Sequence, residues 1–126
     1  MFVYVMEDHT APNVTKIGVS NNPERREREV WMVTTRARYK VADRYIANLI
    51  ESMAQAFAIR KCGRAYHYHG QRQVSSYAQG YTEFFKCTVK QAMGFILRAY
   101  QLFQKLGYDA LRSYRRKFCR THGIHI

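Results

Sequence analysis

The chain has 126 residues, which suits a single domain, and its 21 lysine and arginine residues against 9 acidic residues give a formal net charge of +12. The hydrophobic fraction of 47% is sufficient for a buried core and excludes a wholly disordered chain. No run of 18 apolar residues occurs, which excludes an ordinary membrane-spanning helix. The charge indicates a polyanionic partner, and the 14% aromatic content favours nucleic acid, DNA or RNA, over a membrane surface.

The amino-terminal segment and the cysteines indicate the cellular compartment. Residues 1–8 are too short an apolar stretch, and too acidic, for a signal peptide. The three cysteines are far apart and odd in number, a pattern typical of reduced thiols rather than of a disulfide framework. We therefore expect a cytoplasmic protein.

The first third of the chain predicts a β-hairpin followed by a helix. Residues 2–6 and 14–19 are apolar and β-prone, and the short polar connection between them favours antiparallel pairing. Gly18 inside the second strand indicates a bulge or a close approach of another group. A helix is expected from Pro23 to about Trp31, because asparagine is a favoured helix cap and proline is favoured at the first helical position.

The middle of the chain predicts one further strand, one helix and a long loop. Residues 34–41 are β-prone, and residues 47–61 carry apolar side chains at helical spacing. Residues 62–80 are rich in glycine, glutamine, serine, histidine and tyrosine and are predicted to form a loop, and 82–87 a short strand or a turn.

Two helices are expected at the carboxyl end, over 89–106 and over 108–120, with Gly107 ending the first of them. The predicted fold is therefore a small α/β (α+β) domain, in which helices flank a three-stranded, mostly antiparallel sheet. A basic helical extension over residues 98–126 is expected to pack on the same domain.

Three residue types in the amino-terminal part suggest an anion site. Tyr4 and Lys16 lie on strands that we expect to be adjacent, and the following helix would bring an arginine over the same surface. A guanidinium fork suits phosphate in particular. A tyrosine in a strand is more often a core residue, and an arginine on a short helix is more often solvated.

The same residues resemble the GIY-YIG nuclease superfamily. Phe2-Val3-Tyr4 is similar to the first half of its motif and Lys16-Ile17-Gly18 to the second half, in the phage-associated branch where lysine replaces the second tyrosine. The essential arginine of that family lies eight residues after the motif glycine, which selects Arg26 over its neighbour Arg25. Glu51, in a segment ending at Phe57, resembles the family's metal-binding glutamate. The resemblance implies a nuclease-type domain over residues 1–97.

The resemblance further implies an endonuclease that hydrolyses DNA with one Mg²⁺ or Mn²⁺ ion. In that mechanism Tyr4 accepts a proton from water, with Lys16 beside it favouring the ionised phenolate. Arg26 holds the scissile phosphate and Glu51 binds the metal ion through oxygen. On spacing alone Glu51 reads as a solvated helix residue. The alternative functions are a non-catalytic nucleic-acid-binding module and a toxin-like or antiviral interaction protein.

Further residues are candidates for nucleic-acid contact. Arg25 and Arg28 lie on the first predicted helix, and His67 and His69 lie in the long loop. The last helix carries five cations without an acid among them: Arg112, Arg115, Arg116, Lys117 and Arg120. We interpret this stripe as a phosphate-binding face, with docking to a second subunit in a homodimer as the competing interpretation.

Overall fold

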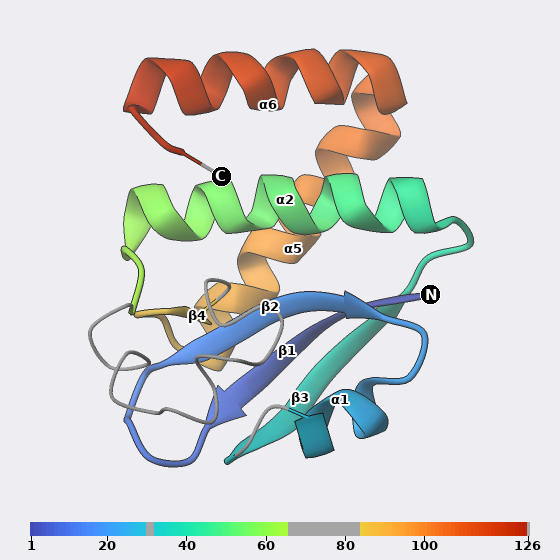
Figure 1. The fold of residues 1–126 in the computed structure, drawn as a ribbon. Coiled ribbons are helices and arrows are strands. Elements are labelled where there is room, and N and C mark those ends of the chain that lie inside the picture. The colour runs from blue at the N-terminus through green and yellow to red at the C-terminus, as the bar shows by residue number, and fades with distance from the viewer. Residues whose placement is uncertain (30–31, 66–83, 126) are drawn as a thin grey trace.

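The computed structural model describes residues 1–29, 32–65 and 84–125. In these residues a four-stranded antiparallel sheet lies against helices on both of its faces (Figure 1). The elements in chain order are β1 (Phe2–Asp8), β2 (Thr15–Ser20), α1 (Pro23–Glu29), β3 (Val33–Lys40), α2 (Arg44–Lys61), β4 (Phe84–Phe85), α5 (Val89–Leu106) and α6 (Tyr108–His122). The α+β class expected from the sequence is confirmed.

The sheet has the order β3-β1-β2-β4, one strand more than the three expected. The added strand is β4, which lies in the segment 82–87 that the sequence predicted to be a short strand or a turn. Its two residues pair with Thr15 and Lys16 on the outer edge of β2. The pairing satisfies backbone groups that a bare edge would leave without partners.

Strand β1 is central and is buried on both faces. Val3, Tyr4, Val5 and Met6 are each 0% exposed. Because successive side chains of a strand point to opposite faces, the four residues divide between two apolar clusters. Val3 and Val5 join the main core with the long helices, whereas Tyr4 and Met6 face the other side.

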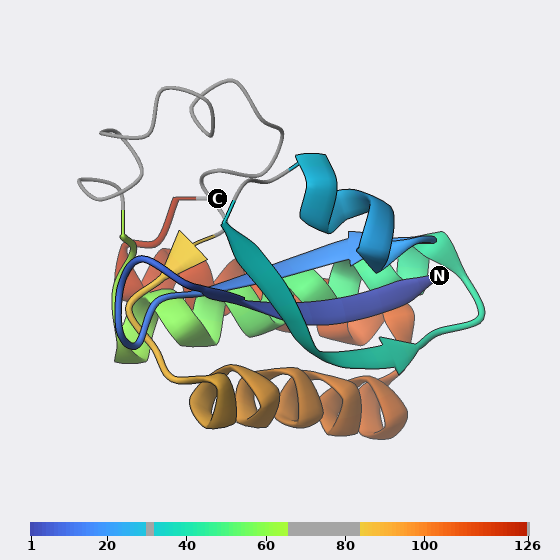
Figure 2. The same ribbon diagram turned by 90° about the horizontal axis from the view of Figure 1, so that it is seen from below.

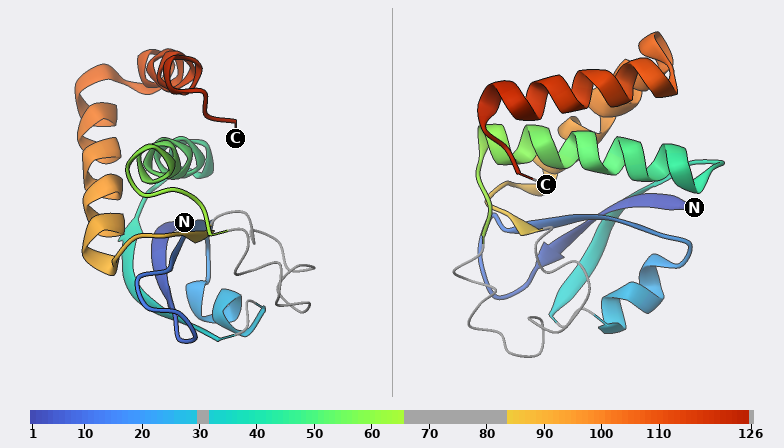
Figure 3. Two further views of the ribbon diagram at one scale, coloured as in Figure 1. Left: turned by 90° about the vertical axis from the view of Figure 1, so that its left-hand side faces the viewer. Right: turned by 45° about the horizontal axis from the view of Figure 1, so that its top comes forward.

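The long helices form a layer over one face of the sheet. Helices α2 and α5 cover this face, and α6 lies along α2 on the side away from the sheet (Figures 1 and 3). Leu111 of α6 is fully buried, and the rings of Phe57 and Phe118 meet edge to face at 5.3 Å between centroids. Helix α1 lies on the opposite face of the sheet (Figure 2).

Local capping sets where the long helices begin and end. Helix α2 begins three residues before the expected Ala47, because the Asp43 carboxylate accepts hydrogen bonds from the amides of Tyr45 and Ile46. Helix α5 begins with a reciprocal capping box between Thr88 and Gln91. Gly107, with φ of 81°, separates α5 from α6 as expected.

The expected end of the first helix, the long loop and the domain boundary compare with the structure in different ways. Helix α1 is described over Pro23–Glu29, and its expected end at Trp31 lies outside the described residues. Most of the predicted loop over 62–80 lies outside the described residues. The boundary expected after residue 97 lies inside the continuous helix α5. Among the described helices, none is long and apolar enough to span a bilayer.

Candidate functional site

The β1–β2 hairpin places Tyr4 across from the motif glycine. Tyr4 and Gly18 are direct partners in the antiparallel register. A Cβ atom on Gly18 would stand 2.4 Å from the Tyr4 hydroxyl oxygen and 2.6 Å from the carbon that carries it. Glycine is therefore required because the tyrosine ring lies directly over the backbone of β2.

Lys16 lies beside this ring and is itself 0% exposed. Its ammonium nitrogen is 5.6 Å from the centroid of Tyr4 and 5.8 Å from that of Phe84. Aromatic faces attract a cation at such distances, and the attraction grows as water is removed. The arrangement places the amino group of Lys16 next to the Tyr4 ring, as the sequence predicted.

Arg26 is turned inward from α1 and completes the cluster. Asn22 begins the helix as expected, accepting a hydrogen bond from the Arg25 amide at 3.2 Å. The Arg26 side chain is 15% exposed, and its guanidinium donates to the Glu29 carboxylate at 2.6 Å. Burial lowers the pKa of Arg26, but hydrogen bonds and charge interactions with Glu29 and Tyr4 more than offset this and raise it above its ordinary value.

The acidic residues of α1 fix the orientation of this helix on the sheet. Glu27 accepts a hydrogen bond from the Thr35 amide of β3 at 2.6 Å. Glu24 pairs with Arg38, also on β3. Each of these contacts is modest by itself, but together they hold α1 in one position across the strands. The alternating charges that would suit a solvated helix face therefore dock α1 and aim Arg26 at Tyr4.

Glu51 occupies a different layer. Helix α2 packs on the sheet face opposite to Tyr4, and the Glu51 side chain is half-buried. One turn later, Gln55 is 5% exposed and its amide nitrogen donates to the Ile17 carbonyl of β2 at 3.0 Å. Because α2 and β2 run in opposite directions (Figure 1), Glu51 lies beside the part of β2 that follows Ile17. That part includes Gly18, over which the Tyr4 ring lies.

The structure thus brings Tyr4, Lys16 and Arg26 together, whereas Glu51 lies on α2, which covers the opposite face of the sheet. Tyr4 and Lys16 do not lie on the molecular surface where the sequence led us to expect an anion site, because both are fully buried. Phe84 of β4 packs in the same cluster as Tyr4, so the short added strand contributes to this burial. Among Tyr4, Lys16, Phe84 and Arg26, which the structure describes, Arg26 is the partly exposed one, with 15% of its side chain accessible.

The other predicted contact residues are dispersed. Arg25 and Arg28 are exposed on α1, and Arg25 lies 3.7 Å from Glu29. His67 and His69 lie outside the described residues. The cations of the α6 stripe are exposed, apart from the half-buried Arg115, and lie on the helical side of the molecule, far from α1 (Figure 3).

Sequence reasoning missed Glu29, which holds Arg26, and Gln55, which ties α2 to β2. Gln55 carries a detectable signal, since it is a polar residue among the apolar positions of α2. Glu29 also carries a signal, since among the three glutamates of α1 it is the one that lies three residues from Arg26, the spacing at which helix side chains meet.

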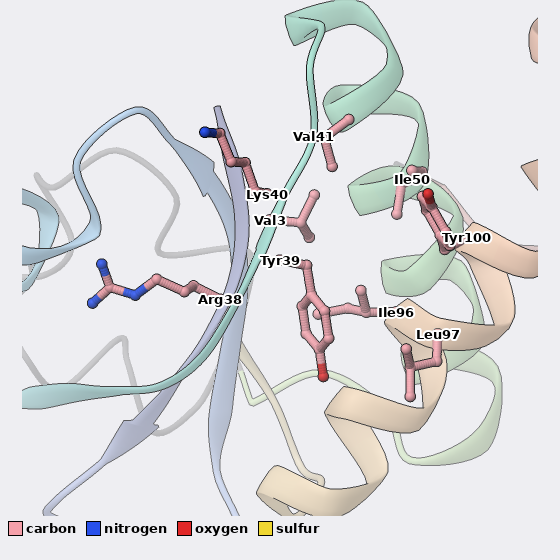
Figure 4. Close-up of a pocket in the computed structure, with 9 residues that line it drawn as sticks. All are labelled: Val3, Arg38, Tyr39, Lys40, Val41, Ile50, Ile96, Leu97 and Tyr100. Atoms are coloured by element: carbon pink, nitrogen blue, oxygen red, sulfur yellow. The ribbon is translucent and has the colours of Figure 1, made fainter.

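A separate pocket opens on the other face of the sheet. It has a volume of about 340 Å³ and is lined mainly by apolar groups of β1, β3, α2 and α5 (Figure 4). Arg38 and Lys40 extend away from it, whereas Tyr39 lies along it. Burial raises the pKa of the Tyr39 hydroxyl. The pocket is distinct from the Tyr4 cluster, because Val3 and Tyr4 point to opposite faces of β1.

One of three comparisons with known proteins found a match, and the matched residues include the amino-terminal motifs. A search of curated proteins and a search of solved structures each returned no match. A protein-family model, that of the T5orf172 domain, matches residues 1–99. The match covers the sheet, α1, α2 and the first half of α5, and with them the whole Tyr4 cluster and Glu51. On this match, the chain belongs to the T5orf172 domain family.

Proposed function

We propose that the protein is a metal-dependent endonuclease that hydrolyses phosphodiester bonds of DNA. The observation that carries the proposal is the cluster itself, in which the Lys16 nitrogen lies 5.6 Å from the centroid of the Tyr4 ring and the inward-turned Arg26 side chain is 15% exposed. The T5orf172 domain family, which is associated with phage nuclease-type domains, supports the same class of activity. The net charge of +12 supports a nucleic-acid substrate.

Each residue of the cluster has a chemical task in this proposal. Phosphodiester hydrolysis requires a group that takes a proton from water and positive charge to stabilise the phosphorane-like transition state. The Tyr4 hydroxyl is the proton acceptor. Arg26 binds the phosphate, since its guanidinium is the one member of the cluster that reaches the surface. Lys16 adds a second, desolvated positive charge behind the phenol.

The carboxylates of the described residues fit one loosely held divalent ion rather than a protein cage. No group of three histidine, cysteine, aspartate or glutamate side chains is gathered among them. A Mg²⁺ ion is commonly held by one or two carboxylates together with water and substrate phosphate. Glu51 would hold such an ion, Mg²⁺ or Mn²⁺, which would supply further charge stabilisation at the phosphate.

The test is cleavage of supercoiled plasmid in the presence of Mg²⁺. We expect Arg26→Ala and Glu51→Ala each to lower the cleavage rate at least ~100-fold, the scale of losing one transition-state contact. Glu51→Ala should leave DNA affinity unchanged or raise it, because a negative charge is removed near phosphate. Arg36→Gln and Asp109→Asn are the matched controls, since both are exposed and lie outside the cluster. Equal cleavage by wild type and both site variants would refute the assignment.

A non-catalytic nucleic-acid-binding module is the second candidate. The full burial of Tyr4 and Lys16 favours it, because buried residues contribute to stability without contacting substrate. It predicts DNA binding with no cleavage under any divalent metal. Tyr4→Phe separates the two functions, because this variant keeps the ring in place and removes only the hydroxyl that the nuclease requires.

A further inference from the structure

A groove lies between the three long helices, on the side of the molecule away from α1. Its volume is about 620 Å³, within the range of roughly 300–1,000 Å³ typical of ligand sites. Side chains of two kinds line it, aromatic and basic, and no carboxylate is among those described: Phe57, Arg60, Lys61, Phe95, Arg98, Phe118 and His122.

The aromatic side chains form the wall of the groove. Phe57 is buried, and its ring meets that of Phe118 edge to face. The Arg98 guanidinium lies over the Phe57 ring, 4.2 Å from its centroid. A guanidinium stacked on one side keeps its other planar face available for a second flat group.

Two of the three cations of the groove lie at the end of a helix, whereas Arg98 lies in the middle of α5. Arg60 and Lys61 occupy the last turn of α2, and the carboxyl ends of α2 and α6 lie side by side (Figures 1 and 3). All three cations of the groove, Arg98 included, are exposed. Positive charge at helix carboxyl ends also complements the helix dipoles, which explains part of their placement but not the aromatic wall between them.

We infer that this groove binds an unpaired nucleotide of a single-stranded nucleic acid. The base stacks on the Arg98 guanidinium and the neighbouring rings, while Arg60 and Lys61 contact the phosphates on either side. A paired base in a duplex is covered on both faces by its neighbours and cannot enter, whereas a single strand offers its bases freely. The inference rests on the proposed function in so far as both require a nucleic-acid partner.

The occupant follows from charge and shape together. An acidic protein segment would satisfy the cations but leave the stacking surface unused. A duplex would meet the cations with its phosphates but leave the recessed rings empty. Only a flexible polyanion that carries flat bases uses both features. The test therefore measures charge and stacking separately.

The charge test compares two triple variants in EDTA, with a labelled DNA single strand of 12 nucleotides as probe. The groove variant is Arg60→Gln/Lys61→Gln/Arg98→Gln. The matched control is Arg44→Gln/Lys90→Gln/Lys105→Gln, which removes the same charge from exposed positions of the same two helices. We expect the groove variant to lose at least ~10-fold in affinity and to flatten the salt slope by ~1.4 units, at about 0.7 for each of the two phosphate contacts. The control should change affinity less than ~3-fold. Equal losses by the two variants would overturn the inference.

The stacking test uses Arg98→Lys, which keeps the charge and removes the planar group. A strand containing 2-aminopurine should lose fluorescence when wild type binds it, because stacking quenches this base. Arg98→Lys should bind with the same salt slope but without the quenching. Quenching that is equal in both proteins would refute the stacking role. Because EDTA prevents metal-dependent cleavage, the binding assay tests the groove independently of nuclease activity. If binding depends on the groove but the protein does not cleave DNA in Mg²⁺, the nuclease proposal is refuted and the groove inference stands.

Discussion

Tyr4 and Gly18 show how closely two residues of the cluster depend on each other. The ring lies where any side chain on residue 18 would be, and Tyr4 is completely buried. The ring therefore has little room to move away. In an interior packed to crystal-like density, an added methyl group is accommodated only by displacing its neighbours.

We expect Gly18→Ala to lower the free energy of unfolding by about 1–3 kcal/mol, the usual range for overpacking. The same substitution in a Tyr4→Leu background should cost clearly less, because the hydroxyl and ring carbon that it meets are gone. Urea denaturation of the four proteins measures this difference. Additive costs would show that the close approach is not the source of the destabilisation.

Cys87 is a second residue whose surroundings affect a measurable property, the pH dependence of stability. Its sulfur lies 3.0 Å from the Thr15 hydroxyl and it is 0% exposed. Burial raises the pKa of the Cys87 thiol from 9.0 to about 11. The folded protein therefore holds this proton more tightly than the unfolded chain does. The resulting stability is fully present below pH 9 and is lost as the pH rises through 11.

We expect wild type to lose about 1.3 kcal/mol more stability than Cys87→Ala does between pH 8 and pH 10, as linkage requires for a shift of this size. Urea denaturation at both pH values measures it. The comparison cancels the ionisation of lysines and tyrosines, which the two proteins share. Identical pH dependence in the two proteins would contradict a strongly raised thiol pKa.

At the scale of elements, helices α1 and α6 use their charges differently. The acids of α1 contact β3 or Arg26, so the helix is docked by its own charged residues. Helix α6 is anchored by apolar contacts at Leu111 and Phe118. Its arginine side chains are consequently left for other partners.

We expect charge reversal of Arg112, Arg116 and Arg120 to glutamate to weaken binding of all DNA sequences alike. Removal of ~3 phosphate contacts should flatten the slope of log affinity against log salt by ~2 to 3 units. Cleavage at saturating DNA should survive, because α6 lies far from the Tyr4 cluster. An unchanged salt slope together with loss of a dimer on size-exclusion chromatography would favour the homodimer interpretation instead.

At the scale of the whole molecule, the sheet separates the two sites that we propose. The Tyr4 cluster and α1 lie on one side, while the groove and the α6 stripe lie on the other (Figures 2 and 3). The proposed cleavage and strand-binding sites are therefore independent of each other in space. Their cooperation requires that α6 fold together with the sheet rather than as a separate appendage.

We expect a single unfolding transition that includes α6. Leu111→Ala should lower the free energy of unfolding by about 2–4 kcal/mol, as for other fully buried leucines. Leu106→Ala, at an exposed leucine, is the control and should cost less than about 1 kcal/mol. Circular dichroism during thermal unfolding measures both. A second, lower transition in Leu111→Ala would show that α6 unfolds on its own.

The sequence by itself determined the features that depend on neighbouring residues. The cap at Asn22, the break at Gly107, the hairpin and the helical periodicity over 89–106 all follow from local rules of geometry and hydrogen bonding. The α+β class followed from the order of these elements. The resemblance to a nuclease family selected Arg26 over Arg25, and the structure turns Arg26 inward.

The tertiary structure alone decided the features that depend on contacts between distant segments. Pairing of β4 with β2 joins residues about 70 positions apart, so the fourth strand and the burial of Lys16 could not be read from either segment. Glu51 had the right spacing, yet the Gln55 hydrogen bond to Ile17 holds its helix on the face of the sheet opposite to Tyr4. The groove exists only because three amphipathic helices pack together, and no local pattern specifies how such helices meet.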